Sequence, residues 1–436
     1  MFSDMKSLIR KLFDGPFRRQ AVGFTIAAAL FAVQPAISWA VDLSGDSNTY
    51  VGSRQTADGE KILGGYEYLD LAVSDLGSDT VSFHTGGWLR YDLKGEEFGN
   101  KTNNDLSYSY LSFKSKTDNT IVNLGRVMVF EGVAAERVDG LYARTDLAGN
   151  FGVSAFGGSP VETNINEPGN NVIYGTRVSH QIPGLYIVGL SYLQEKKNSE
   201  DFRKEEGVDL WFRPLDKVEL FGWSKYNAET RNWMDITYNL GLGPFAALKL
   251  NTIASWISYR DYFDGTTNPA FGFKPDVINP SEKVAILGEE AVYSLTNETS
   301  VSVDYKGYTY DIAGDAKYYG ATVRYGAESG GAGLSYHQMD GGTDRLKYKE
   351  YRVYGYRKIG KTDLALDLLD VAYAAEINGV KNAYSASAAA GYELTDNLKA
   401  GLDAEYSKNP DFDKDIRVFL KLMYKFDLGH GAQGGA

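Results

Sequence analysis

The residues that most often carry catalysis or bind metals are few in this sequence. It holds four histidines and no cysteine. His84, His180, His337 and His430 lack the spacing of a zinc site, and a chain without cysteine can form neither a thiolate metal site nor a covalent haem link. The glycine-rich run at 330–333 lacks the lysine of a phosphate-binding loop and indicates a turn. We therefore expect no catalytic residue, no metal and no resident cofactor, and we expect His84 and His337 to be polar wall residues.

Charged side chains recur at every second position, and this pattern predicts a different chemistry. In the segment 301–306, apolar residues at odd positions alternate with Ser302, Asp304 and Lys306. Such alternation separates an apolar face of a β-strand from a polar one. In a closed barrel the polar face lines the lumen, where charges hydrate the wall and select among ions. On this parity the predicted lumen-lining residues are Arg90, Asp92, Arg144, Arg177, Asp304, Lys306, Arg324, Lys399, Asp403, Glu405, Arg417, Lys421 and Lys425.

The elements that must position these charges are many short strands. The 436 residues include 48 Gly and 31 Tyr, a composition that suits tight turns and aromatic girdles. Alternation continues from about residue 63 almost to the end. A soluble sandwich or propeller also alternates, but Tyr at the ends of the apolar faces favours a membrane. We predict an all-β, transmembrane antiparallel β-barrel of about 20 strands over 63–428.

The N-terminal region predicts export. Basic residues precede an uncharged apolar run at 21–33, and small residues at 38 and 40 fit a signal peptidase site. We expect a signal peptide at 1–40, cleavage after Ala40, and a periplasmic N-terminal segment at 41–62. The apolar run is shorter than the ~20 residues of a membrane helix. Removing 1–40 makes the chain still more acidic than its formal net charge of −12, which argues against a nucleic-acid partner.

Connections between strands are expected to be short. Two longer ones, at about 159–171 and 262–282, are predicted to be extracellular loops, because periplasmic turns are the shorter class. The alternation slips near Leu368 and Leu369, which suggests a β-bulge there. The segment 106–113 could present either face.

The end of the chain carries a local signal. Tyr424 and Phe426 end one face of an alternating run, and they resemble the last-strand signal that the barrel-assembly machinery reads in outer-membrane proteins. That resemblance implies two partners, the assembly machinery and outer-membrane lipid. In the family the aromatic residue usually closes the chain, whereas here a flexible tail at 429–436 follows.

The layout as a whole resembles Gram-negative outer-membrane porins, which implies a wide polar channel for ions or small solutes. The run Glu-Gly-Val-Ala-Ala-Glu-Arg at 131–137, followed by Val-Asp-Gly-Leu-Tyr at 138–142, is similar to barrel subunits of porin–cytochrome electron conduits. That resemblance implies an alternative, a sheath around multihaem c-type cytochromes. The sheath hypothesis explains how such a barrel avoids leakage, because a wide barrel with neither plug nor inward loop would let solutes pass freely. An outer-membrane enzyme is a distant third hypothesis, and we expect no enzymatic activity.

Overall fold

A computed structural model describes residues 42–55, 61–94, 101–117, 119–161, 171–263, 279 and 281–428 of the chain. The predicted signal peptide at 1–40, its cleavage site, the tail at 429–436 and His430 therefore lie outside the described residues. None of the helices in the described part is long and apolar enough to cross a membrane.

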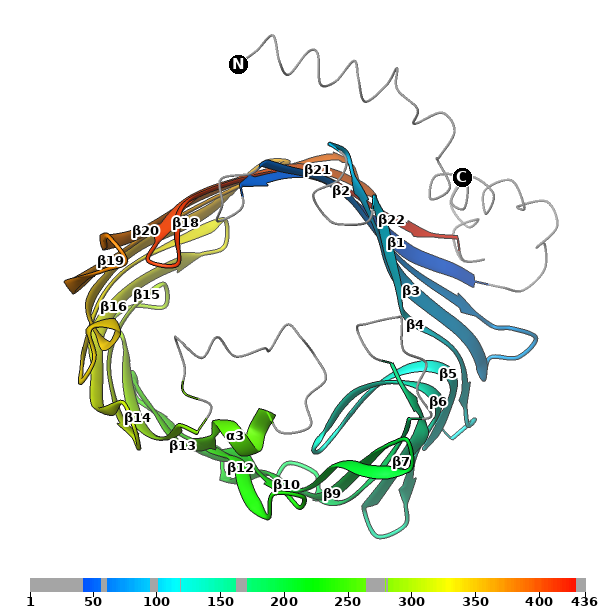
Figure 1. The fold of residues 1–436 in the computed structure, drawn as a ribbon. Coiled ribbons are helices and arrows are strands. Elements are labelled where there is room, and N and C mark those ends of the chain that lie inside the picture. The colour runs from blue at the N-terminus through cyan, green and yellow to red at the C-terminus, as the bar shows by residue number, and fades with distance from the viewer. Residues whose placement is uncertain are drawn as a thin grey trace.

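The described residues form a single 22-stranded antiparallel sheet that closes into a barrel (Figure 1), because β1 pairs with both β2 and β22. The all-β barrel is confirmed, but the expected number of about 20 strands is wrong. The strands are β1 Asp42–Gln55, β2 Lys61–Ser74, β3 Val81–Asp92, β4 Thr102–Lys114, β5 Thr120–Glu131, β6 Ala134–Leu147, β7 Phe151–Pro160, β8 Val172–Ile182, β9 Tyr186–Lys197, β10 Glu200–Leu215, β11 Val218–Asn227, β12 Asn232–Phe245, β13 Leu248–Ser258, β14 Lys283–Ser294, β15 Thr299–Tyr310, β16 Gly314–Ala327, β17 Gly330–Gly341, β18 Lys347–Ile359, β19 Thr362–Ile377, β20 Val380–Thr395, β21 Leu398–Asn409 and β22 Phe412–Asp427. The short helices α3 Tyr259–Phe263 and η3 Asp344–Leu346 lie between strands.

The first strand corrects the expectation of a separate N-terminal segment at 41–62. Residues 42–55 form β1, which pairs along its length with β2 and also with Val418–Asp427 of β22. Its outward face carries Gly, Ser and Thr between Leu43 and Val51. This weak apolar signal explains why the alternation was not recognised before residue 63. Pairing with the last strand supplies the stability that a single edge strand lacks.

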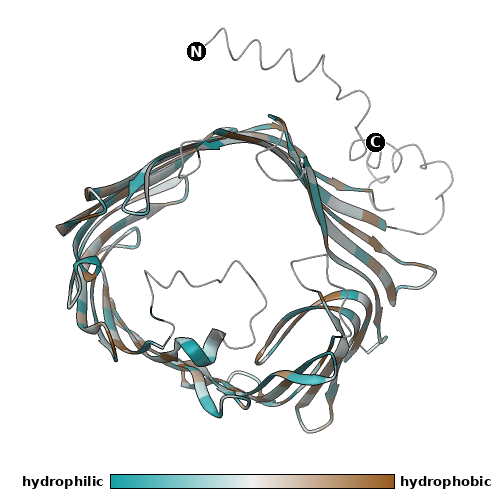
Figure 2. Cartoon of the chain, viewed as in Figure 1, coloured by the Kyte–Doolittle hydropathy of each residue, from teal (hydrophilic) through white to brown (hydrophobic). Residues whose placement is uncertain are grey.

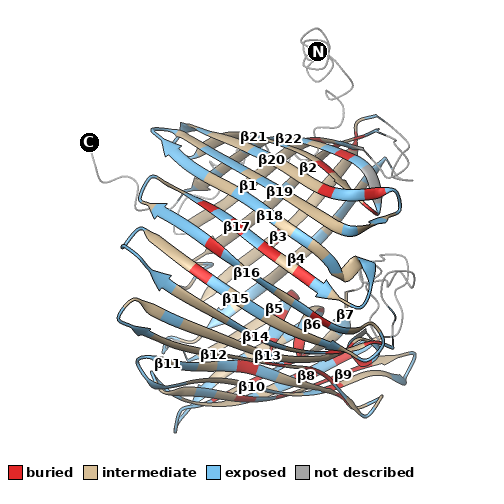
Figure 3. Cartoon of the chain, turned by 90° about the vertical axis from the view of Figure 1, so that its left-hand side faces the viewer, coloured by how far each residue is buried: buried red, intermediate tan, exposed pale blue. Residues whose placement is uncertain are grey.

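Most strands present an apolar outward face and a polar inward face. Leu190, Leu287 and Leu334 are 61%, 65% and 57% exposed on the outside, and Figure 2 shows brown and teal alternating along the strands. Apart from one small apolar cluster beneath β5 and β6, buried residues are scattered over the sheet (Figure 3), because a hollow barrel has no common interior of packed side chains. An outward surface of this kind is stable in hydrocarbon only when every backbone group is paired, which closure achieves.

The two rims differ in their connections. We call the rim at which β1 begins and β22 ends the terminal rim, and the opposite one the loop rim. The predicted long connections, between β7 and β8 and between β13 and β14, both leave the loop rim. Turns at the terminal rim are short, as between β6 and β7 at 148–150.

Two ambiguous segments are settled by the register. Leu368 and Leu369 lie in continuous pairing with β18 and β20, so the predicted bulge there is wrong, and the register shifts only between Ala372 and Ile377. The apparent slip arises because Leu369 is an apolar residue on the inward face. In β4, a shift opposite Gly86 and Gly87 turns Leu106 outward along with Leu111.

Candidate functional site in the barrel lumen

The register places every predicted lumen charge on one face of the sheet. Arg417 stands opposite Glu405, and the same row of cross-strand partners passes through Ser387, Asp367, Tyr354 and Gly333 to Arg324. A second row joins Arg144 through Ser154 to Arg177. The remaining members share this inward parity: Arg90, Asp92, Asp304, Lys306, Lys399, Asp403, Lys421 and Lys425.

These charges are mostly held by carboxylates that the parity argument did not name. Within the predicted set, Lys421 and Asp403 form an ion pair with each other. Arg417 contacts Asp415 at 2.5 Å, Arg324 lies 3.9 Å from Glu290, and Lys399 pairs with Asp363. The wall therefore carries positive and negative charges side by side, and the sign of the local electrostatic potential alternates over short distances.

His337 and Asp304 form a pair on the same wall. The imidazole Nε2 lies 2.9 Å from Oδ1 of Asp304, and the ring stacks on Tyr318 with 5.0 Å between ring centroids. A Cβ at Gly320 would lie 2.2 Å from His337 Cδ2, so the histidine lies flat over that glycine. His337 is thus a packed wall residue.

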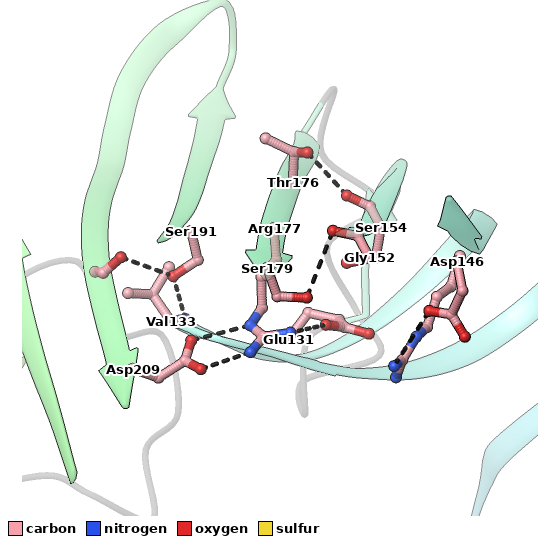
Figure 4. A network of polar contacts seen from close by, with 12 residues as sticks. Glu131, Val133, Asp146, Gly152, Ser154, Thr176, Arg177, Ser179, Ser191 and Asp209 are labelled. Atoms are coloured by element: carbon pink, nitrogen blue, oxygen red, sulfur yellow. Dashed lines mark hydrogen bonds and ion pairs between the residues drawn. The ribbon is translucent and has the colours of Figure 1, made fainter. Parts of the chain in front are cut away.

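The main feature inside the barrel is the hairpin formed by β5 and β6, whose tip folds against the inward face of β8–β10. The N–H of Val133 donates to Ser191 Oγ at 3.1 Å, and a Cβ at Gly207 would lie 2.4 Å from Val133 Cγ1. Figure 4 shows Val133, Ser191 and the neighbouring ion pairs from close by. Since Ser191 and Gly207 belong to the inward face of the barrel, the tip lies in the lumen.

Two ion-pair networks anchor this hairpin. Arg177 of β8 donates to both oxygens of Asp209, at 2.9 and 2.6 Å, and lies 3.8 Å from Glu131 at the tip. Tyr142 donates to Glu131 at 2.6 Å. Glu131, with 8% of its side chain exposed, is the buried member of this network. Removing Arg177 would leave its charge buried and unpaired, which typically costs about 3–5 kcal/mol.

Arg203 of β10 makes the second network, with Glu136 of the hairpin at 2.6 Å and with Glu205 of its own strand. Glu205 is buried, with 3% of its side chain exposed. Both networks therefore link the hairpin tip to β8–β10, which lie far from it along the chain.

A small apolar core fills the space beneath the hairpin. Val127, Val138, Ile173 and Leu193 have at most 1% exposed surface, and all of them have inward parity. Elsewhere the inward face is mostly polar, so polarity is reversed at these positions. The outward positions of the hairpin include the charged Arg126, Arg137 and Asp139 as well as the apolar Met128 and Phe130. This inversion was visible in the sequence and would have predicted that the hairpin leaves the wall.

The opposite face of the hairpin looks into the open lumen. Phe130 is 70% exposed and Met128 is 50% exposed, and both alternate with the valines that pack against β8–β10. In Figure 1 the β5–β6 hairpin curls away from the wall into the barrel. The expectation of a lumen without an inward element is therefore wrong. The lengths of the connections in the sequence do not reveal this element, because it is a bent hairpin rather than a long loop.

Helix α3 is a second element at the loop rim, on the neighbouring part of the wall. Asp261 is fully buried and accepts from Asn232 at 2.9 Å and from Ser258 at 2.5 Å, while its carbonyl accepts from Asn227 at 3.1 Å. These bonds fix α3 to the ends of β11–β13.

A closed antiparallel barrel with an apolar exterior and a charged interior defines a class, the porin-like β-barrels of the bacterial outer membrane. The chain belongs in that membrane, because no other arrangement of strands satisfies its backbone in lipid. No family model matches the sequence, and no curated protein matches it.

Solved structures nevertheless share the fold. The ferric enterobactin receptor PfeA of Pseudomonas aeruginosa superposes with a TM-score of 0.56 at 10% identity, covering 88% of this chain and 80% of that one. The siderophore receptor PirA of the same organism gives 0.51 at 11% identity, with the same coverage of 88% and 80%. OccD3 (OpdP) of P. aeruginosa gives a lower TM-score of 0.43 at 10% identity, over 89% of this chain and 92% of that one, and carries no argument about the fold. At these identities the likeness concerns the fold alone, and none of these structures supports an electron conduit.

Proposed function

We propose that this barrel is a passive outer-membrane channel for ions and small hydrophilic solutes, narrowed on one side by the β5–β6 hairpin. The observation that carries the proposal is the inward wall of paired charges, which suits a water-filled lumen. Barrels of 16–18 strands already leave an aqueous channel, and 22-stranded ones are wider still. An inward hairpin reduces that width without closing the barrel.

The alternative hypothesis, a sheath around a cytochrome, rests on the premise that the lumen contains no inner element. The anchored hairpin removes this premise, since it lies in the lumen and the ion pairs of Glu131 and Glu136 hold it there. Breaking these ion pairs would leave charges unpaired at a cost of several kcal/mol.

The test is reconstitution of the purified barrel in planar bilayers and in liposomes with sugars of increasing size. We expect ion conductance from the barrel alone, together with a size limit for sugars. Replacing 130–135 by an Asn-Gly turn should raise both the conductance and the size limit, because this removes the tip of the hairpin from the lumen. A matched replacement of the β18–β19 turn, Gly360-Lys361, by Asn-Gly should change neither.

A barrel that assembles but conducts no ions would contradict the channel proposal. Co-purification of haem with such a silent barrel would favour the sheath in its place. An unchanged size limit after hairpin shortening would show that the hairpin is not the constriction.

A further inference from the structure

The wall of the barrel has an unpaired seam between β4 and β5. Register pairs join only Ser109–Lys114 of β4 to Ile121–Arg126 of β5. The remaining half of β4, Thr102–Tyr108, pairs with β3 but has no partner on β5 in the described residues. The seam exists because β5 turns inward after Arg126 to form the lumen hairpin.

The seam extends into the membrane. A spanning strand needs ~9–11 residues, and the paired part of β4 runs from the terminal rim only to Ser109. The upper part of the spanning height, on the side of the loop rim, therefore lacks strand pairing at this position. No other adjacent pair of strands separates over such a length in the described residues.

A single face of β5 leads through this seam. Leu124, Arg126, Met128 and Phe130 alternate on it. Leu124 stands opposite Leu111 on the outside of the barrel and is 53% exposed, whereas Phe130 is 70% exposed in the lumen. This face, apolar except at Arg126, thus passes from lipid to lumen without crossing a sheet. Leu141 and Leu106, 46% and 43% exposed, widen its outer end.

Polar contacts hold the seam together at its middle. Arg126 binds Asp139 at 2.6 and 2.8 Å, donates to the carbonyl of Leu106 at 3.0 Å, and lies 3.7 Å from Asp105. Arg137 of β6 also pairs with Asp105 of β4. Bonds from side chains thus replace the backbone ladder here. They can be exchanged for bonds to another anion, whereas a backbone ladder cannot.

We propose that this seam is a lateral gate, through which amphiphiles with a long apolar chain and a carboxylate head pass between the lumen and the outer leaflet. The chain follows Leu124, Met128 and Phe130, and the carboxylate replaces Asp105 or Asp139 on the arginines. Guanidinium groups favour such bidentate exchange between carboxylates. This route is additional to passage of small polar solutes along the barrel axis.

Locking the seam tests the gate. The native chain has no cysteine, so an Asp105→Cys/Arg137→Cys pair joined by a short bismaleimide is a specific lock. We expect the lock to abolish uptake of radiolabelled oleate into outer-membrane vesicles, with arabinose uptake unchanged. The matched control is Lys358→Cys/Glu393→Cys, an ion pair on β18 and β20 away from the seam, whose crosslinking should leave both uptakes unchanged. Unchanged oleate uptake after locking, or equal loss of oleate and arabinose, would overturn the gate.

A second measurement does not depend on the lock. A bimane fluorophore on Met128→Cys should be quenched by doxyl-stearate in vesicles, whereas bimane on Tyr356→Cys, an inner-wall position whose native side chain is 57% exposed, should not. Equal quenching at both positions, or none at Met128→Cys, would refute a connection between bilayer and lumen at the seam. Arabinose uptake and ion conductance report on the axial channel independently.

Discussion

At the scale of single residues, the close contact between the β5–β6 hairpin and β9 depends on Gly132. Its φ is +61°, in the left-handed region that favours glycine, and an added Cβ would lie 2.2 Å from Ser191 Oγ and 2.3 Å from Ser191 Cβ. No rotamer of Ser191 moves its own Cβ away. The tip of the hairpin can therefore approach β9 only with glycine at this position.

We expect Gly132→Ala to destabilise the barrel by about 1–3 kcal/mol and to widen the channel, because it combines backbone strain with a steric clash. Single-channel conductance in planar bilayers measures the widening. Gly184→Ala is the matched control, since Gly184 has a φ of +78° with no atom within 4 Å of the added Cβ. If both variants conduct alike, the contact with Ser191 does not hold the hairpin.

At the scale of elements, barrel closure depends on the pairing of β1 with β22. Phe426 has outward parity, and its ring lies over Gly45, where an added Cβ would be 2.9 Å from Phe426 Cζ. Tyr424 stacks beside it at 5.9 Å between ring centroids. Both aromatic residues of the predicted assembly signal thus lie on the outer side of the closing strand pair.

We expect Phe426→Asp to prevent assembly, because a carboxylate on the outward face costs free energy in lipid and loses the packing on Gly45. Loss of the heat-modifiable band in the membrane fraction is the measurement. Met423→Asp introduces the same charge in the same strand on the inward face, and this control should assemble. Normal assembly of Phe426→Asp would refute the assignment of this face.

The first strand gives a further prediction at this scale. Strand β1 begins at Asp42, two residues after the predicted cleavage site. We expect the mature chain to begin at Val41, which N-terminal sequencing of outer-membrane material will determine. Ala40→Arg should block processing, because signal peptidase accepts small residues at this position. Recovery of native material with 1–40 intact would contradict the prediction.

At the scale of the whole molecule, ion selectivity should be weak. The sequence has a formal net charge of −12, but its inner-wall cations stand beside carboxylates. A small cation preference therefore remains, and salt should reduce it. The Debye length falls from about 10 Å at 0.1 M to about 3 Å at 1 M, so the wall no longer influences ions in the centre of a wide lumen.

We expect Arg324→Glu and Lys421→Glu to shift the reversal potential toward greater cation preference at 0.1 M salt and to have almost no effect at 1 M. Arg324 is exposed on the inward wall, with 49% of its side chain accessible. Lys349→Glu, on the outward face of β18, is the control and should leave the reversal potential unchanged. No shift in either inward variant would show that these charges do not face the ion path.

Much of this architecture follows from the sequence alone, because side-chain alternation is a local property of a strand. It was enough to predict an all-β antiparallel barrel and to assign Arg324, Lys421 and the other charges to one face. The alternation also separated the two longer connections from the short turns. The role of the charges in ion selection stays a prediction.

The assignment of β1 and the position of the β5–β6 hairpin were decided only by the tertiary structure. Both depend on contacts between residues that are distant in the chain. Strand β1 is a barrel strand only through its pairing with β22, and residues 42–55 alone are too weakly apolar to show it. The β5–β6 hairpin leaves the wall because Val133 bonds to Ser191 on β9 and Glu131 lies beside Arg177 on β8. Those contacts bury valines on the inward face of the hairpin, and they produce both the inward hairpin and the seam between β4 and β5.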